Sequence, residues 1–270
     1  RSLNSYKSQF GESKLNSVSE EKRATSKISK PRSITLTDVD QTFSPLSPNV
    51  LTDINLNIES GELVSIIGPS GSGKSTLIKN IVGLYQPTKG QILYGNHDWM
   101  DYDDETIRQS FAYVSQETNI FRGTIYDNLT MYNEDYDLEQ VRKVARIACF
   151  DDVVMNLPQG YSHQLGDNGN GLSGGQLQRL SITRALLASP QILFLDEATS
   201  ALDVPTERKV IQNIKQLNLT VIAVAHRLLT AKLSDQVVVL DKGFVKELGH
   251  PDELLQQDNS LFKKLVEDEE

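Results

Sequence analysis

The most constraining feature of this 270-residue sequence is the segment Gly68-Pro-Ser-Gly-Ser-Gly-Lys-Ser75. It matches the pattern G-x-x-x-x-G-K-[ST], which is typical of phosphate-binding loops. Glycines let successive backbone N–H groups turn toward one anion, and the helix that follows directs the positive end of its dipole at the same place. The segment lies between the apolar run 63–67 and a helical pattern at 74–84. We therefore interpret residues 68–76 as a phosphate-binding loop, hereafter the P-loop.

Each residue type in the P-loop suits a chemical task. Lys74 would supply a point charge to the β- and γ-phosphates of a nucleotide, and the Ser75 hydroxyl would ligate Mg²⁺. The predicted nucleotide-binding residues of the loop are Gly68, Pro69, Ser70, Gly71, Ser72, Gly73, Lys74, Ser75 and Thr76.

Apolar patterns in the rest of the chain predict strands that alternate with helices. Asp137 and Gln140 have the spacing of a capping box for one of these helices, and Leu138 begins its predicted apolar face. Alternation of this kind is typical of an α/β fold with a mostly parallel sheet. Strands are expected at 34–39, 54–58, 63–67, 191–195, 220–225 and 237–240, and helices at 74–84, 138–148, 175–188 and 205–217.

Two adjacent carboxylates, Asp196 and Glu197, end the apolar run that begins at Ile192. In an α/β sheet, residues at the carboxyl end of a strand face the ligand crevice. We therefore expect Asp196 to hold Mg²⁺ and Glu197 to polarise a water for attack on a γ-phosphate. The alternative is an ordinary strand exit with two surface acids, and the P-loop upstream favours the catalytic interpretation.

The segment Leu172-Ser-Gly-Gly-Gln176 lies just before this strand. It resembles the signature motif of ATP-binding cassette (ABC) ATPases, and the resemblance covers residues 33–270. It implies an ATPase that uses ATP and Mg²⁺, with a P-loop NTPase (RecA-like) core and a mostly parallel sheet. It also implies an N-terminal antiparallel β subdomain and an inserted α-helical subdomain at about 117–182. The signature residues that would bind ATP are Ser173, Gly174, Gly175 and Gln176.

The same resemblance implies roles for four single residues. Gln116 lies where the family has the glutamine of its Q-loop, which implies a catalytic role and a contact with Mg²⁺. Asp203 lies in the D-loop, near the nucleotide, and His226 at the position of the catalytic switch histidine. Phe43 lies where the family stacks an aromatic ring on adenine. Taken alone, Gln116 would be a surface amide, His226 a structural histidine and Phe43 a core residue.

Two further segments, Phe121–Leu129 and Tyr161–Gly169, resemble the exporters of this family. The second departs from the pattern, because exporters commonly have Glu where Asp167 or its neighbours stand. The resemblance implies a half-size exporter, similar to bacterial peptide, bacteriocin or toxin exporters, whose two copies bind ATP head to tail. A membrane domain would then precede residues 1–32, which would be a linker. The ATPase would lie at the cytoplasmic face of a membrane, as in a bacterial inner membrane.

The net charge of −9 is unevenly distributed along the chain. Residues 1–32 hold eight Lys or Arg and three Glu, a net charge of +5, so the remainder carries −14. An acidic body disfavours nucleic acid as a partner. The basic segment is interpreted as a solvated linker, and attachment to an anionic membrane surface is the alternative.

Cysteine content and apolar patterning exclude further classes. The single cysteine, Cys149, excludes an intrachain disulfide and a zinc finger. The apolar runs fall far short of the roughly 18 residues that span a bilayer. The sequence begins at Arg1 without a secretory signal, so we expect it to be part of a longer chain.

Other members of the family offer alternative functions. A chromosome-maintenance ATPase would place a long coiled coil between Lys74 and Leu172, which are fewer than a hundred residues apart. A translation-type protein would have two cassettes, whereas the sequence has one P-loop. The alternative to an exporter is therefore the ATPase subunit of an importer, or another ABC ATPase without a role in transport.

Overall fold

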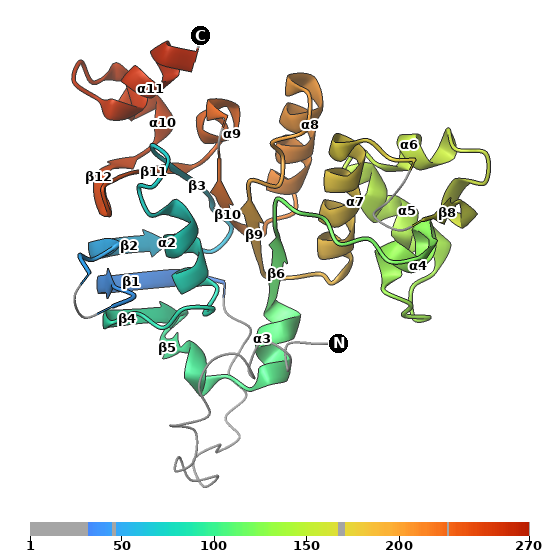
Figure 1. The fold of residues 1–270 in the computed structure, drawn as a ribbon, viewed down its shortest axis with the longest axis horizontal. Helices are drawn as coiled ribbons and strands as arrows, with labels where there is room; N and C mark the ends of the chain where they lie inside the picture. Colours follow the sequence, from blue (N-terminus) through green and yellow to red (C-terminus); the bar gives the residue numbers. More distant parts are fainter. Residues whose placement is uncertain (1–31, 45–46, 167–170, 226, 270) are drawn as a thin grey trace, which may run out of the picture.

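The computed structural model describes residues 32–44, 47–166, 171–225 and 227–269 (Figure 1). The predicted linker, apart from Arg32, lies outside the described residues, as do Asp167 and His226.

A six-stranded sheet forms the centre of the molecule, in the order β12-β11-β3-β10-β9-β6. The five strands from β11 to β6 are parallel, and β12 pairs with β11 antiparallel. Strands β3 and β10 are buried along their whole length, as expected for apolar runs in a parallel sheet covered on both faces. The predicted α/β fold with a mostly parallel sheet is confirmed. The strands are β3 (Leu63–Ile67), β6 (Phe111–Val114), β9 (Ile192–Asp196), β10 (Thr220–Val224), β11 (Gln236–Asp241) and β12 (Phe244–Gly249).

A second sheet is antiparallel, in the order β2-β1-β4-β5. Its strands are β1 (Ile34–Gln41), β2 (Leu51–Ile58), β4 (Lys89–Tyr94) and β5 (His97–Asp98). Helix α2 (Lys74–Ile81) lies between the two sheets (Figure 1). Its apolar residues Leu77, Ile78 and Ile81 belong to one buried cluster with residues of both sheets. The P-loop is therefore attached to a helix that is fixed on two sides.

The other face of the central sheet packs against helices that lie between β6 and β9 in the chain, together with α8. They share a buried cluster that includes Val141, Leu180, Leu193 and Ile211. The elements of this region are β7 (Gly123–Thr124), α4 (Ile125–Thr130), α5 (Leu138–Ile147), α6 (Asp151–Met155), β8 (Gln164–Leu165), α7 (Gly174–Leu187) and α8 (Val204–Lys215).

Four further helices complete the fold of the described residues. Three of them follow β10, and the buried Phe262 anchors the last of them in a cluster with Val237 and Leu254. The helices are α3 (Asp104–Ser110), α9 (Leu228–Lys232), α10 (Pro251–Gln256) and α11 (Leu261–Glu269), with 3-10 turns at Trp99–Asp101 and Gly160–Ser162. Among the helices in the described ranges, none combines the length and apolarity needed to cross a membrane.

The structure corrects the predicted bounds of α2 and the predicted place of Leu138, and it adds elements that had no predicted counterpart. Helix α2 ends at Ile81 rather than at residue 84, because Gly83 adopts a left-handed φ of 82°. The capping box of Asp137 and Gln140 is confirmed, but Leu138 is 48% exposed and does not belong to the apolar face. Strands β4 and β12 had no predicted counterpart, since each is more exposed than a core strand.

A buried carboxylate, Asp151, stabilises the helical region. It accepts hydrogen bonds from Arg142 Nε at 3.0 Å, Arg146 Nε at 3.3 Å and the Tyr161 hydroxyl at 2.7 Å. Burial raises the pKa of Asp151, but the hydrogen bonds from Arg142 and Tyr161 outweigh it, and the net pKa lies below its ordinary value. The ionised carboxylate therefore stabilises the folded state.

We expect Asp151→Asn to lower the free energy of unfolding by about 1–3 kcal/mol at neutral pH, because it weakens the hydrogen bonds from Arg142, Arg146 and Tyr161 to a charged acceptor. A depressed pKa in the folded state stabilises at pH values above the unfolded pKa and loses that effect as pH falls through the folded pKa. The difference from the parent should therefore shrink below about pH 4. Urea unfolding at several pH values measures it. Asp152→Asn, at an exposed neighbour on the same helix, is the control and should change little.

Candidate functional site

Neighbouring strands of the central sheet bring the P-loop, Asp196 and Gln116 to one edge. The P-loop follows β3, residue 226 follows β10 by two positions, Asp196 ends β9 and Gln116 follows β6. These strands are parallel and adjacent, so their carboxyl ends meet at the same edge. Backbone bonds tie the strand exits together: Glu197 N donates to Val224 O at 3.2 Å.

The P-loop closely approaches the end of β11. Gly68 has a φ of 146°, and a Cβ at this position would lie 2.0 Å from the Leu240 carbonyl oxygen. Only glycine fits this contact. Among the described residues, no side chain caps the N-terminus of α2, and its first turn contains no acidic residue. The start of α2 thus presents uncapped backbone N–H groups and the positive end of the helix dipole beside the loop, as phosphate binding requires.

Lys74 is the buried cation of this loop. It is 8% exposed, and its Nζ donates to the carbonyl oxygens of Gly68 at 2.7 Å and Pro69 at 2.9 Å. Burial lowers the pKa of Lys74, while the nearby carboxylates of Glu197 and Asp196 oppose that shift. The structure therefore brings the predicted lysine and both predicted carboxylates together, although they are more than a hundred residues apart in sequence.

One polar atom of the P-loop fits a phosphate ligand. The Ser72 hydroxyl is buried and has no hydrogen-bond partner among the described residues. Buried hydroxyls normally form a hydrogen bond, so the Ser72 hydroxyl is suited to bond a ligand such as phosphate in this loop. Ser75 and Thr76 lie in the first turn of α2, at the same end.

Asp196 and Glu197 have different local environments. The Tyr113 hydroxyl, from the adjacent strand β6, donates to Asp196 Oδ2 at 2.6 Å. Burial and this hydrogen bond raise the pKa of Tyr113, so its phenol stays protonated and remains a donor. Glu197 has a positive φ of 56°, a conformation that costs energy in a residue other than glycine and is found at functional sites.

Tyr113 was missed by the sequence interpretation. It lies in the apolar run just before Gln116 and reads as a strand residue. Its role depends on strand pairing, which the sequence does not show. In the structure Tyr113 pairs with Phe194 on the neighbouring strand, two residues before Asp196.

The signature residues lie on a different part of the molecule from the P-loop. Ser173 caps α7: its hydroxyl accepts from Gln176 N at 3.3 Å, and Gln176 Oε1 accepts from Ser173 N at 2.8 Å. A Cβ on Gly175 would lie 2.8 Å from the carbonyl oxygen of Ala201, so α7 starts directly against the 200–203 loop. Helices α2 and α7 lie on opposite sides of β9 and β6 (Figure 1).

The structure places the other predicted site residues as follows. Asp203 caps α8, and its Oδ2 accepts a hydrogen bond from Thr206 N at 3.1 Å. Hydrogen bonds from Thr206 lower the pKa of the Asp203 carboxyl. Gln116 is exposed, beyond the end of β6. Phe43 is 59% exposed and meets the ring of Tyr85 edge-on at 5.2 Å, so its alternative interpretation as a core residue is wrong.

Comparison with known proteins identifies the family. Residues 51–200, more than half of the chain, match the family model described as ABC transporter. The chain belongs to the ABC transporter family. It corresponds to the ATP-binding part of such transporters, as the resemblance implied.

Two relatives and one solved structure show how far this similarity extends. The chain is 40% identical over 236 residues to the alpha-hemolysin translocation ATP-binding protein HlyB of Escherichia coli, covering 87% of this chain and 33% of HlyB. It is 44% identical over 235 residues to the heterocyst differentiation ATP-binding protein HepA of a Nostoc species, covering 86% of this chain and 38% of HepA. It superposes on a bacterial Atm1-family ABC exporter with ATP bound at a TM-score of 0.82 and 32% identity, over 90% of this chain and 42% of that one. The chain thus spans about a third of the length of the relatives.

Two glycines of the P-loop should respond differently to substitution. At Gly68, alanine would both strain the backbone and displace the Leu240 carbonyl, so we expect a loss of about 3 kcal/mol or more in unfolding free energy. At Gly71, φ is 77° but a Cβ would meet nothing within 4 Å, so Gly71→Ala should cost only about 1–2 kcal/mol. Thermal or urea unfolding of both variants measures the difference. Equal losses would contradict the close approach at Gly68.

Proposed function

We propose that this domain is the ATP-hydrolysing motor of an ABC exporter that moves a peptide or protein cargo across a membrane. One observation carries the ATPase assignment: the P-loop, Asp196, Glu197 and Gln116 all leave the same edge of the central sheet. The direction of transport and the kind of cargo are supported by the relatives, one of which is named for the translocation of alpha-hemolysin. The matching solved structure is also an exporter.

The oxygen donors at this edge suit Mg²⁺, which prefers hard oxygen ligands. Ser75, Asp196 and Gln116 would hold the ion through a hydroxyl, a carboxylate and an amide oxygen. When bound, Mg²⁺ supplies positive charge that offsets the negative charge of the phosphate oxygens. The Tyr113 hydroxyl bonds Oδ2 of Asp196, and the other carboxylate oxygen would bind the ion.

The residues of the chain divide the chemistry among them. Lys74 would exchange its bonds to the Gly68 and Pro69 carbonyls for bonds to the β- and γ-phosphates. Glu197 would take a proton from the water whose oxygen attacks the γ-phosphorus, while the bond to the β-phosphate oxygen breaks and ADP leaves. His226 is proposed to contact the γ-phosphate, and the exposed Phe43 to stack on adenine.

We further propose that two copies bind ATP between them, head to tail. The residues Ser173 and Gly174 are exposed at the start of α7, a 14-residue helix whose first turn has no acidic residue. This terminus lies apart from the P-loop of its own chain (Figure 1). The site proposed here therefore takes its second set of donors, residues 173–176, and Asp203 from the facing copy.

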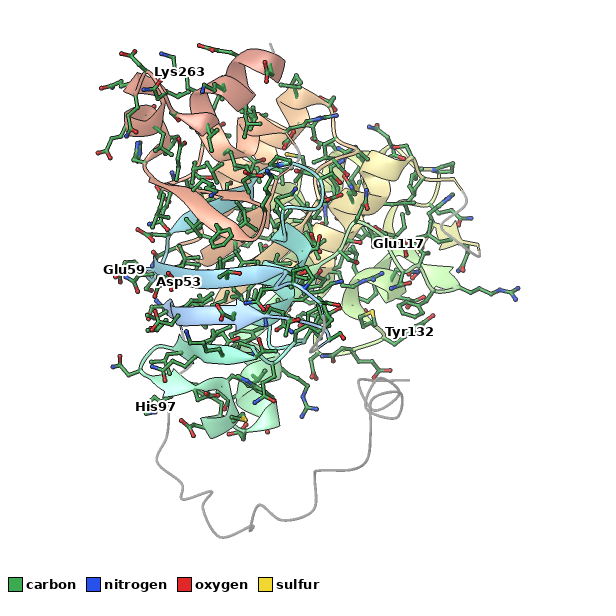
Figure 2. The ribbon with its side chains drawn as sticks, turned by 60° about the vertical axis from the view of Figure 1, so that its left-hand side comes forward. Asp53, Glu59, His97, Glu117, Tyr132 and Lys263 are labelled. Carbon is green, nitrogen blue, oxygen red and sulfur yellow. The ribbon has the colours of Figure 1, made fainter. Side chains whose placement is uncertain are left out.

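The membrane domain is proposed to contact the region around Gln116. Figure 2 shows Glu117 and Tyr132 on the helical part of the molecule, on the opposite side from Asp53 and Glu59. Phe121, Met131 and Tyr132 expose apolar surface in this region. In this arrangement residues 1–32 are the linker from the membrane domain and residues 33–270 the ATPase domain, with its helical subdomain at about 117–182. The domain would then lie at the cytoplasmic face of a bacterial inner membrane.

The substitution Glu197→Gln tests both the chemistry and the assembly. It keeps the shape of the side chain but removes the base, so hydrolysis should fall by about 10²–10⁴-fold while ATP still binds. ATP-bound copies should then accumulate as dimers, which sedimentation with and without Mg·ATP would detect. Lys74→Ala is the matched comparison, because it should weaken nucleotide binding itself. Normal turnover in Glu197→Gln would contradict the assignment of the base, and a monomer under all conditions would contradict the shared site.

The substitution Tyr113→Phe tests how Asp196 is held. Removing the hydroxyl deletes a hydrogen bond to a carboxylate, so the Mg²⁺ dependence of nucleotide affinity should shift to about tenfold higher Mg²⁺. Calorimetry with ATP and EDTA should show unchanged affinity in the absence of the ion. Tyr126→Phe, whose hydroxyl bonds the Tyr136 carbonyl in the helical region, is the control. An unchanged Mg²⁺ dependence in Tyr113→Phe would show that this bond does not position Asp196.

A further inference from the structure

Glu207 is a buried carboxylate that the chemistry above does not use. It lies near the start of α8 and is 1% exposed. Its Oε1 accepts from the Thr199 hydroxyl at 3.0 Å and from the Thr230 hydroxyl at 2.8 Å, and its Oε2 lies 3.4 Å from Arg227 Nη1. A helix N-terminus favours a carboxylate at the surface, but this one is turned inward, where desolvation is costly.

The partners of Glu207 come from the two segments that carry the proposed catalytic residues. Thr199 lies two residues after Glu197, on the loop that leaves β9. Arg227 is the residue before α9 and directly follows position 226, and Thr230 lies within α9. The carboxylate therefore links the exit of β9 to the exit of β10.

Arg227 makes a second link. Its Nη1 also donates to the carbonyl oxygen of Leu202, in the 200–203 loop. Leu202 N in turn donates to Thr199 O at 3.0 Å, so the same loop is connected to the exit of β9. The pair of Glu207 and Arg227 thus fixes three chain segments relative to one another, and its contacts with Thr199, Leu202 and Thr230 lie outside the P-loop.

We propose that Glu207 and Arg227 are a positioning pair for hydrolysis. They act through other residues: Glu207 through Thr199 on the loop of Glu197, and Arg227 through its place beside position 226. Displacing a catalytic group by about 1 Å costs up to about 100-fold in rate. Nucleotide affinity depends mainly on the P-loop, so the pair should affect kcat and leave KM and Kd for ATP nearly unchanged. This inference rests on the proposed ATPase function.

The test compares Glu207→Gln, Arg227→Gln and the double variant by ATPase kinetics and by binding of a fluorescent ATP analogue. Gln at 207 retains an oxygen for both threonines and loses only the ion pair. Each single variant should lower kcat about 10–100-fold, with KM and Kd within about twofold of the parent. The double variant should be no slower than the slower single variant, because residues that act as one unit are not additive. Arg227→Lys, which keeps the charge, should recover part of the lost rate.

A control separates positioning from stability. Asp151→Asn also alters a buried carboxylate paired with arginine, but in the helical region, and should leave kcat near that of the parent. Arg227 is partly exposed, so its variants remain informative if Glu207→Gln folds poorly. If the parent has ATPase activity, two results would overturn this inference alone. In the first, the single variants keep the kcat of the parent, and in the second they lose kcat and ATP affinity together. A parent without ATPase activity would overturn the proposed function and the inference with it.

Discussion

Parallel pairing of β3, β10, β9 and β6, in that order, is the constraint on which the whole site depends. The four strands are separated in sequence by helices and by the entire helical region, yet their carboxyl ends meet at one edge. Lys74, Asp196, Glu197 and Gln116 each lie within two residues of the end of one of these strands or at the start of the helix that follows it. A shift of one residue in any register would turn side chains to the opposite face, so the buried apolar faces of β3 and β10 also maintain the chemistry.

At this edge of the sheet, burial and neighbouring carboxylates have opposite effects on the charge of Lys74. Lys74 is desolvated, which alone would favour its neutral form, and Asp196 and Glu197 favour its charged form. The positive terminus of α2 adds to the same field and has no acidic side chain of its own to offset it. The site thus holds one buried cation near two carboxylates, with a loop shaped for an anion. Such an arrangement suits a ligand that brings both phosphate and a divalent metal, because each would complete the charge of the other.

Local patterns predicted the parts of the structure that depend on local chemistry. The P-loop, the carboxylates after β9 and the capping box at Asp137 each need only a short run of specified residues, and the buried strands need only apolar composition. Tyr113 and Glu207 could not be found in this way, because their partners lie 83 and up to 23 residues away in sequence. The exposed strands β4 and β12 have no continuous run of apolar residues. They form because they pair with β1 and β11, and this pairing cannot be seen in the local sequence.

The 200–203 loop connects the two halves of this arrangement. On one side, Gly175 at the start of α7 contacts the Ala201 carbonyl, and Gln178 accepts from Ala201 N at 2.9 Å. On the other side, Arg227 bonds the Leu202 carbonyl beside the exit of β10. Both contacts involve backbone atoms of two successive residues, Ala201 and Leu202, so the loop is held from the side of α7 and from the side of β10. The 200–203 loop therefore connects the start of α7 to the segments that carry the proposed hydrolytic groups.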